Sequence, residues 1–459
     1  ENPFMATANK KSIPHVMDMT QGNPAKLMLT FAIPLFIGNI FQQIYSMVDT
    51  MVAGYTLGDS AIAAIGATSA LSSLIVNFAI GLNSGCAIVV TQRFGAHDEP
   101  RLRASIAGMM ELDAVITGVL TVLSLVFLRP LMHFMNTPET IMEHAYGYIA
   151  VLCAGMLATI AYNMFSGILR ALGNSRTSLF FLIIASVLNI GLDVLFVSVL
   201  GMGVAGAALA TVIAQAVSAA LCGIYVFRHY RQYWPHRRDF QVSPALLREL
   251  VANGLAMALM HCVVDLGSVI FQRANNQLGE AFISAHTAAR RIIGIMSQPL
   301  STLSMAASTF IGQNWGAQKL KRIRVALRQA LVMEIIWSLV AWILIFTLGN
   351  FLVQLTTGTS DPQIISNAVM SLRWHLSFFP ALGCLFVLRN SMQSMGRPII
   401  PILSSCIELC MKILSAAIAV PYLGFLGTCI TEPFTWLVMF LFLGAGYLVL
   451  RKKLLPTEA

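Results

Sequence analysis

The segment FAIPLFIGNIFQQIYSMVDTMVAGYTL, residues 31–57, decides how the rest of this chain is interpreted. It is long enough to cross a bilayer, because about 20 mostly apolar residues span the hydrocarbon core. It nevertheless contains a carboxylate, Asp49, and a charge at the centre of a membrane helix costs roughly 2.5–3.5 kcal/mol on insertion scales. An acid in such a place is expected to have a function, and coupling to an ion is the first hypothesis.

Two residues that weaken helices, Pro34 and Gly38, lie in the same segment. Membrane helices tolerate such residues where neighbouring helices satisfy the freed backbone groups. We therefore expect the first helix to bend at Pro34 and Gly38.

The composition of the whole chain is that of an integral membrane protein. Of its 459 residues, 57% are hydrophobic and only 11% are charged, with a mean hydropathy of +0.75. Soluble domains have about 25% charged residues. The net charge of +9 does not indicate nucleic-acid binding, because the basic residues lie in short connectors between apolar runs. The eight cysteines all fall within apolar runs without a CxxC pair, so we expect no metal site and no disulfide.

Twelve apolar runs predict an all-α integral membrane protein with twelve transmembrane helices. The runs cover approximately residues 28–55, 61–91, 104–128, 144–168, 178–199, 204–227, 249–274, 282–312, 325–348, 365–391, 399–420 and 425–449. Basic residues concentrate at the N-terminus, in alternate connectors and in the tail, so both termini are expected in the cytoplasm. The first residues have no apolar core of a signal peptide, and Met5 is a candidate native start.

The two halves of the chain repeat one another. Leu57-Gly58-Asp59 returns 221 residues later as Leu278-Gly279-Glu280, and Gln92–Ala96 returns at the same offset as Gln313–Ala317. An offset of six helices relates the halves by an axis along the membrane normal, and it predicts two pseudo-symmetric six-helix lobes facing a cavity. The expected organisation is a cytoplasmic N-terminal segment, an N-lobe, a cytoplasmic linker, a C-lobe and a cytoplasmic tail, at residues 1–26, 27–228, 229–246, 247–450 and 451–459.

Several polar residues lie inside apolar runs of the first half: Asn163, Asn189, Asp193 and Thr211, in addition to Asp49. Asn189 and Asp193 are four residues apart and share a helix face. Paired acids raise one another's pKa, and carboxylate, amide and hydroxyl oxygens ligate hard cations, so the group suits H⁺ or Na⁺. The structural alternative for Asn163 and Thr211 is hydrogen bonding between helices.

The second half contains two further i,i+4 pairs, His261 with Asp265 and Glu408 with Lys412. The second pair is either self-neutralising or part of a cavity. His261 and Asp265 resemble an acyltransferase pair only faintly, because their spacing is one residue short, and the chain has no HExxH, GxSxG or Walker A sequence. We therefore expect no enzymatic activity.

The motifs together resemble those of the MATE multidrug and toxic-compound extrusion family, over residues 27–449. They are Val48-Asp49-Thr50, Gln92–Ala96, Arg170–Asn174, Asn189-x-x-x-Asp193 and Gly203–Thr211, with the second-half repeats Gln313–Ala317 and Gly424–Gly427. The resemblance implies the twelve-helix MATE/MOP-type fold and an antiporter of the bacterial inner membrane. Such a protein exports amphipathic, often cationic compounds in exchange for H⁺ or Na⁺, and so confers antibiotic resistance. No cofactor other than the ion is expected, and the partners would be small amphipathic substrates and membrane lipids, with a monomer as the working unit.

Within the family, the acids of the first and fifth helices resemble the DinF-like branch. That branch implies a cation site at Asp49, Asn163, Asn189, Asp193 and Thr211, with protonation linked to bending of the first helix. The NorM-like branch uses acids of the seventh and tenth helices; here the seventh offers Asp265, but the tenth has Arg373 and Arg389 and no acid. We keep Asp265, His261, Glu408 and Lys412 as secondary candidates for a C-lobe substrate or cation site. The alternative function is a flippase of the same superfamily for a lipid or a lipid-linked oligosaccharide, whose cavity would be cationic.

Overall fold

The computed structural model describes residues 16–57, 59–134, 139–357 and 361–454. The side chains of Asp49, of most residues between 57 and 71 and of a few others lie outside this description. The predicted all-α fold is confirmed. The main helices are α1 (Pro24–Leu57), α2 (Asp59–Gly95), α3 (Glu99–Phe134), α4 (Glu139–Ala154), α5 (Met156–Ala171), α6 (Ser175–Asp193), α7 (Gly203–His229), α8 (Pro244–Asn275), α9 (Glu280–Gly316), α10 (Leu320–Thr357), α11 (Pro362–Ser377), α12 (Phe379–Ser394), α13 (Ile399–Leu414), α14 (Val420–Leu423) and α15 (Phe425–Leu454).

Within the described residues, nine helices are long and apolar enough to cross a membrane, and two bent pairs raise that number to eleven. The pairs are α4 with α5 and α11 with α12, which bend by 47° and 49°. Helix α9 is as long as its neighbours, at 37 residues, but its Arg, Gln and Ser residues make it less apolar. The nine helices, the two bent pairs and α9 together account for the twelve transmembrane spans that the sequence predicts, and we call each span a rod.

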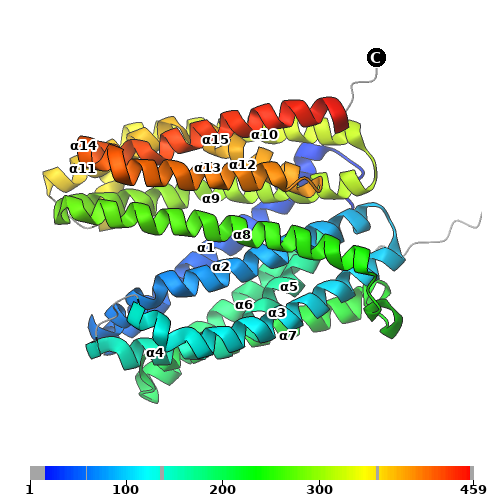
Figure 1. Ribbon diagram of the computed structural model, residues 1–459, viewed down its shortest axis with the longest axis horizontal. Helices are drawn as coiled ribbons and strands as arrows, with labels where there is room; N and C mark the ends of the chain where they lie inside the picture. Colours follow the sequence, from blue (N-terminus) through cyan, green and yellow to red (C-terminus); the bar gives the residue numbers. More distant parts are fainter. Residues whose placement is uncertain (1–15, 58, 135–138, 358–360, 455–459) are drawn as a thin grey trace, which may run out of the picture.

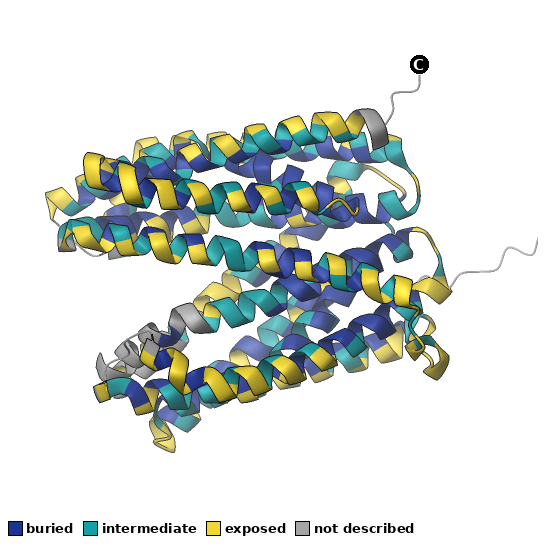
Figure 2. Cartoon of the chain, viewed as in Figure 1, coloured by how far each residue is buried: buried dark blue, intermediate teal, exposed yellow. Residues whose placement is uncertain are grey.

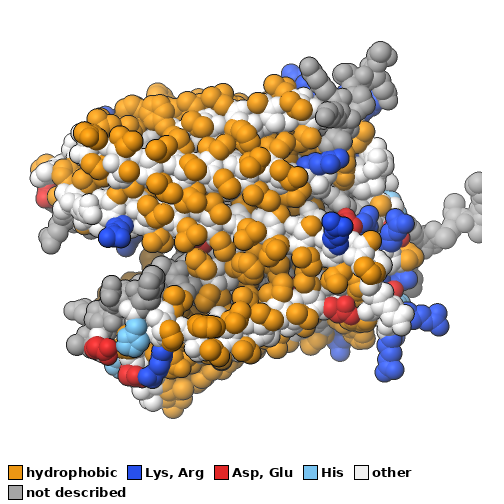
Figure 3. Space-filling view, viewed as in Figure 1, with side chains coloured by type: hydrophobic (Ala, Val, Ile, Leu, Met, Phe, Trp, Pro, Cys, Tyr) orange, Lys and Arg blue, Asp and Glu red, His pale blue; other side chains and the backbone are white. Residues whose placement is uncertain are grey.

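The rods form two lobes, one built mainly from α2–α7 and the other from α8–α15 (Figure 1). The lobes meet at one end, which we call the base; it contains the short helices η2 (Arg231–Tyr233) and η3 (Arg237–Phe240) and the end of α15. They diverge at the opposite end, the mouth, where the molecule is hollowed between them (Figure 3). Hydrophobic side chains cover most of the visible flank, whereas Lys and Arg gather mainly at the base (Figure 3). Exposed positions follow the outer faces of the helices, and buried positions lie inside each lobe and where the lobes meet (Figure 2).

Helix α1 belongs to both lobes. Along its length it packs against α6 of the N-lobe and α9 of the C-lobe. Its first turns contribute Met28, Phe31 and Leu35 to the apolar core of the C-lobe. A helix that contacts both bodies can transmit a change in one lobe to the other.

The pseudo-symmetry extends to irregular backbone. The fifth and eleventh rods each contain a π-helix near their mouth ends, η1 (Val194–Val199) and η5 (Ser415–Ala419), which start 221 residues apart. His97 and Gln318, at the same offset, are the two non-glycine residues of the described chain with positive φ, at 55° and 57°. Such conformations are uncommon for residues with a Cβ. Their recurrence at equivalent places confirms that the lobes are structural repeats.

Candidate functional site

Three of the predicted cation-site residues, Asn163, Asn189 and Thr211, line one small cavity inside the N-lobe. We call it the N-lobe polar cavity; its volume is about 60 Å³, and its walls come from α1, α2, α5, α6 and α7. Asn189 Nδ2 donates to Thr211 Oγ1 at 3.4 Å, and Asn163 Nδ2 donates to the carbonyl oxygen of Thr159 at 2.8 Å. This space is sufficient for a few water molecules or a partly hydrated cation.

Asn189 is 2% exposed, and its Oδ1 accepts no hydrogen bond from the described residues. A buried carbonyl oxygen without a donor is costly unless water or an ion satisfies it. The oxygen therefore leaves a ligand position open at the N-lobe polar cavity.

Asp193 is the last residue of α6, one turn beyond Asn189, and its side chain is fully buried. The helix changes there into η1, and π-helical turns are frequent at functional sites. The other predicted acid, Asp49, lies on the same α1 that walls the cavity, but its side chain is outside the described residues. The assignment of a cation site to these acids stays a prediction.

The expected bend residues pack tightly. Helix α1 runs continuously through Pro34, which is buried. At Gly38, a Cβ atom would lie 3.2 Å from a side-chain carbon of Leu182 on α6, so only a glycine permits this approach without displacement. Whether α1 bends at these residues during function stays a prediction.

The secondary candidates of the C-lobe do not form one site. Asp265 accepts a hydrogen bond at 2.9 Å from Asn77 of α2, across the lobe boundary, whereas His261 faces a separate central cavity. Lys412 Nζ lies 2.9 Å from Glu408, and Arg389 lies 3.7 Å from the other oxygen of that carboxylate. Of the two alternatives for this pair, the geometry favours the self-neutralising one.

The central cavity lies between the lobes above the base and has a volume of about 400 Å³. Its walls come from α2, α5, α8, α9 and α12 and contain many Ser, Thr and Met side chains. Two guanidinium groups line it, Arg170 from the N-lobe and Arg389 from the C-lobe, and no Asp or Glu is among its described lining residues. Arg170 donates to Ser166 at 2.6 Å and makes no ion pair within the described residues. The cavity is therefore polar and locally positive.

Two equivalent glutamines cross between the lobes and bond to the backbone of residues that line the central cavity. Gln92 Nε2 of the N-lobe donates to the carbonyl oxygen of Ser394 in the C-lobe at 2.7 Å. Gln313 Nε2 of the C-lobe donates to the carbonyl oxygen of Ala171 in the N-lobe at 3.1 Å. We call this reciprocal pair the base clasp; both glutamines are at least nine-tenths buried.

The sequence reasoning missed the functional location of Arg170, which it used as part of a motif, and of both clasp glutamines, which it used only as a mark of the repeat. A signal was present for the glutamines, because both are amides at the base ends of equivalent helices. Nothing in the local pattern around Arg170 shows that it faces the space between the lobes.

Comparison with known proteins agrees with this architecture. The model of the family described as MatE matches residues 34–195 and 256–418, one segment in each lobe. "Probable multidrug resistance protein YpnP" of Bacillus subtilis is 29% identical over 388 residues, covering 83% of this chain and 84% of that protein. "DNA damage-inducible protein F" of Escherichia coli is 24% identical, covering 74% and 75%. A solved structure described as the outward-facing conformation of a multidrug resistance MATE family transporter superposes with a TM-score of 0.88 at 24% identity, covering 97% of this chain and 99% of that one.

Proposed function

The chain belongs to the MatE family of membrane transporters, and on that premise we propose that it exports amphipathic compounds by antiport against H⁺ or Na⁺. The observation that carries the proposal is the N-lobe polar cavity, which offers the open Oδ1 of Asn189 one turn from the buried Asp193. Ionisable residues inside a membrane mark ion pathways more often than structural contacts. Multidrug export is suggested by the names of the relatives.

In the proposed cycle, a cation enters from the mouth and binds at Asp193, Asn189 and Asp49. The described state is open at the mouth and closed at the base, and substrate would leave from it. Cation binding then favours the opposite state, in which the base opens. An entering charge releases about 2.3 kcal/mol per 100 mV of membrane potential, which is sufficient to sustain a concentration ratio of some tens-fold.

We further propose that the base faces the cytoplasm of a bacterial cell and that a monomer is the working unit. Lys and Arg gather at the base, as the positive-inside rule requires of a cytoplasmic surface (Figure 3). Each polypeptide contains both lobes and both cavities, so no second copy is needed to complete a site.

The test is ion-driven export from proteoliposomes. We would impose a Na⁺ or a pH gradient and compare ethidium movement by the wild type, Asp193→Asn and Asp49→Asn, with Glu143→Gln as the control. Glu143 is an exposed acid paired with Arg129, and it lines neither cavity. Loss of ion-driven movement in the two site variants, with normal movement in the control, is the expected result. Full ion-driven export by Asp193→Asn would refute the site.

The central cavity favours a second candidate function, movement of an anionic amphipath such as a phosphate-bearing lipid. Arg170 and Arg389 line it, and guanidinium groups bind phosphate well. The same liposomes would be tested with an anionic fluorescent lipid in place of ethidium. Movement of the lipid that depends on Arg170, with none of ethidium, would establish this alternative.

A further inference from the structure

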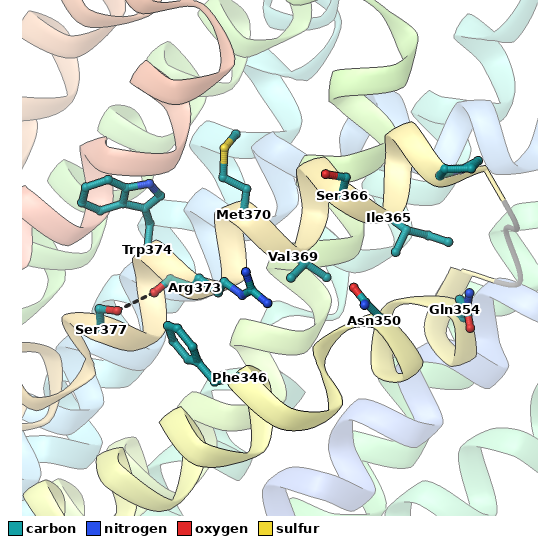
Figure 4. A pocket seen from close by; sticks show the side chains of 11 residues that line it. Phe346, Asn350, Gln354, Ile365, Ser366, Val369, Met370, Arg373, Trp374 and Ser377 are labelled. Carbon is teal, nitrogen blue, oxygen red and sulfur yellow. Dashed lines mark hydrogen bonds between the residues drawn. The ribbon is translucent and has the colours of Figure 1, made fainter.

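A groove of about 830 Å³ runs along the outside of the C-lobe between α10 and α11. We call it the outer groove; its polar lining comprises Asn350 and Gln354 of α10 and Ser366, Arg373 and Ser377 of α11. Phe346 and Trp374 lie at its inner end, and the Arg373 side chain extends from α11 towards α10, between Phe346 and Asn350 (Figure 4). The outer groove is separate from the N-lobe polar cavity and from the central cavity, with which it shares no lining residue.

The sequence of α10 fixes the depth of this groove in a membrane. Residues 330–349 form the mostly apolar part of the helix, between Gln329 and Asn350. At about 1.5 Å per residue this part is about 30 Å long, the thickness of the hydrocarbon core. Asn350 and Gln354 are thus expected at headgroup level on the mouth side, and Phe346 one turn deeper.

Arg373 is a charge without an acidic partner at that inner end. Its guanidinium carbon lies 5.4 Å from the centre of the Phe346 ring, and its side chain makes no ion pair or hydrogen bond within the described residues. Two other arginines of the C-lobe helices have acidic partners: Arg290 lies 2.7 Å from Glu432, and Arg389 lies 3.7 Å from Glu408. A cation–π contact at an exposed site contributes only about 0.5–1 kcal/mol, so it does not replace a counter-ion near the edge of the hydrocarbon.

The surroundings indicate what supplies the counter-ion. Around the groove, α10 presents large apolar residues to the outside, with Leu348 45% and Phe351 59% exposed, so the groove opens towards lipid. A ligand that fits this groove has a negative charge to pair with Arg373. It also has polar groups that can bond at headgroup level to the amide and hydroxyl side chains of the groove, and a hydrocarbon part that lies deeper in the membrane. No Asp or Glu is among the described lining residues, so no carboxylate there would form an ion pair with the ammonium of a zwitterionic headgroup.

We propose that the outer groove binds an anionic phospholipid of the mouth-side leaflet. Its phosphate accepts hydrogen bonds from the Arg373 guanidinium, which can reach up to headgroup level as arginines near helix ends do. Asn350, Gln354 and Ser366 bond to the remaining headgroup, and an acyl chain lies over Phe346 and Trp374. The site is distinct from the transport pathway and does not depend on the direction of transport.

The test counts the lipids that the purified full-length protein retains. Wild type, Arg373→Gln and Arg273→Gln would be released from nanodiscs with equal amounts of phosphatidylglycerol and phosphatidylcholine and weighed by native mass spectrometry. Arg273 is a matched control, because it is an exposed arginine at the mouth end of α8 that has no ion pair within the described residues and does not line the groove. We expect the wild type and Arg273→Gln to retain one phosphatidylglycerol, and Arg373→Gln to retain about tenfold less, as loss of one charge-assisted contact predicts.

The remaining outcomes are equally decisive. Equal retention of phosphatidylglycerol by all three proteins, or equal retention of the two lipids by the wild type, would overturn the proposal. Displacement of the lipid by excess inorganic phosphate would also overturn the proposal, because it would indicate a site for a soluble anion. Detection of a protein dimer without bound lipid would overturn it as well. Should Arg373→Gln fold poorly, Asn350→Leu keeps the charge and removes a headgroup contact; we expect a few-fold loss of phosphatidylglycerol from it, and unchanged retention would again overturn the assignment.

Discussion

Adding one methyl group at the base should push the lobes apart. A Cβ atom at Gly95 would lie 1.9 Å from the backbone oxygen of Gln313, and a Cβ at Gly316 would lie 1.8 Å from that of Gln92. Real Cβ contacts essentially never fall below 3.0 Å, so the two backbones must separate by about 1 Å at each substitution. Gly95→Ala and Gly316→Ala are therefore incompatible with the closed base.

The energy of this change follows from the base clasp. Its two hydrogen bonds, at 2.7 and 3.1 Å, lie beside these glycines and would lengthen with the separation. A buried hydrogen-bonding group left without a partner costs about 1–3 kcal/mol. Even the lower value, about 2 kcal/mol for both bonds, changes the ratio of base-closed to base-open molecules about thirtyfold.

Distances between spin labels on the two lobes would measure that ratio. Labels at Glu99 and Gln318, both exposed at the base, would be introduced into a cysteine-free variant in nanodiscs. We expect a longer distance to become the main population in Gly95→Ala and Gly316→Ala. Gly118→Ala, where the added methyl meets nothing within 4 Å, should behave as the parent. Folded glycine variants with the parent's distance distribution would refute the inference that the clasp holds the base closed.

Three further predictions concern the lobes themselves. Asn189→Leu should fill the N-lobe polar cavity and remove the bond to Thr211, so ion-driven export in proteoliposomes should fall about tenfold while substrate binding persists; unchanged export would count against a cation site there. Lys412→Met should leave the largely buried Glu408 with only its longer ion pair, to Arg389, and destabilise the fold by about 3–5 kcal/mol. The melting temperature should therefore fall, and adding Glu408→Gln should partly restore it. An unchanged melting temperature would contradict the self-neutralising pair. Gly38→Val should overpack the α1–α6 contact by about 1–3 kcal/mol and lower the melting temperature, and a neutral effect would mean that α1 adapts easily.

The sequence was sufficient for the scaffold because its signals are local or periodic. Apolar runs located the helices, and the 221-residue offset predicted equivalences that extend to the backbone of His97 and Gln318. The Glu408–Lys412 pair was predictable for the same reason, since i,i+4 residues meet on any helix.

Contacts between the lobes were not predictable from these signals. Asp265 bonds to Asn77, which is 188 residues away, and each clasp glutamine bonds to a backbone carbonyl of the other lobe. A pattern within one helix gives the face on which a residue lies but not what stands opposite. Arg170 is the clearest example, because its place in the same cavity as Arg389 follows only from how the two lobes face each other.

The repeat also explains why we expect one cation site rather than two. Under the 221-residue offset, Asn189 and Asp193 correspond to Cys410 and Leu414, which are exposed and cannot ligate a hard cation. Thr211 corresponds to Glu432, and that carboxylate already has Arg290 at 2.7 Å and His375 at 3.4 Å. At the equivalent positions, the C-lobe thus has either no oxygen ligand or a carboxylate that is already paired with a basic side chain of the protein. The two lobes share a scaffold but differ in their side chains at the equivalent of the N-lobe polar cavity, so a cation can act on the N-lobe alone. Helix α1 packs against both lobes and is therefore the element through which the C-lobe would respond.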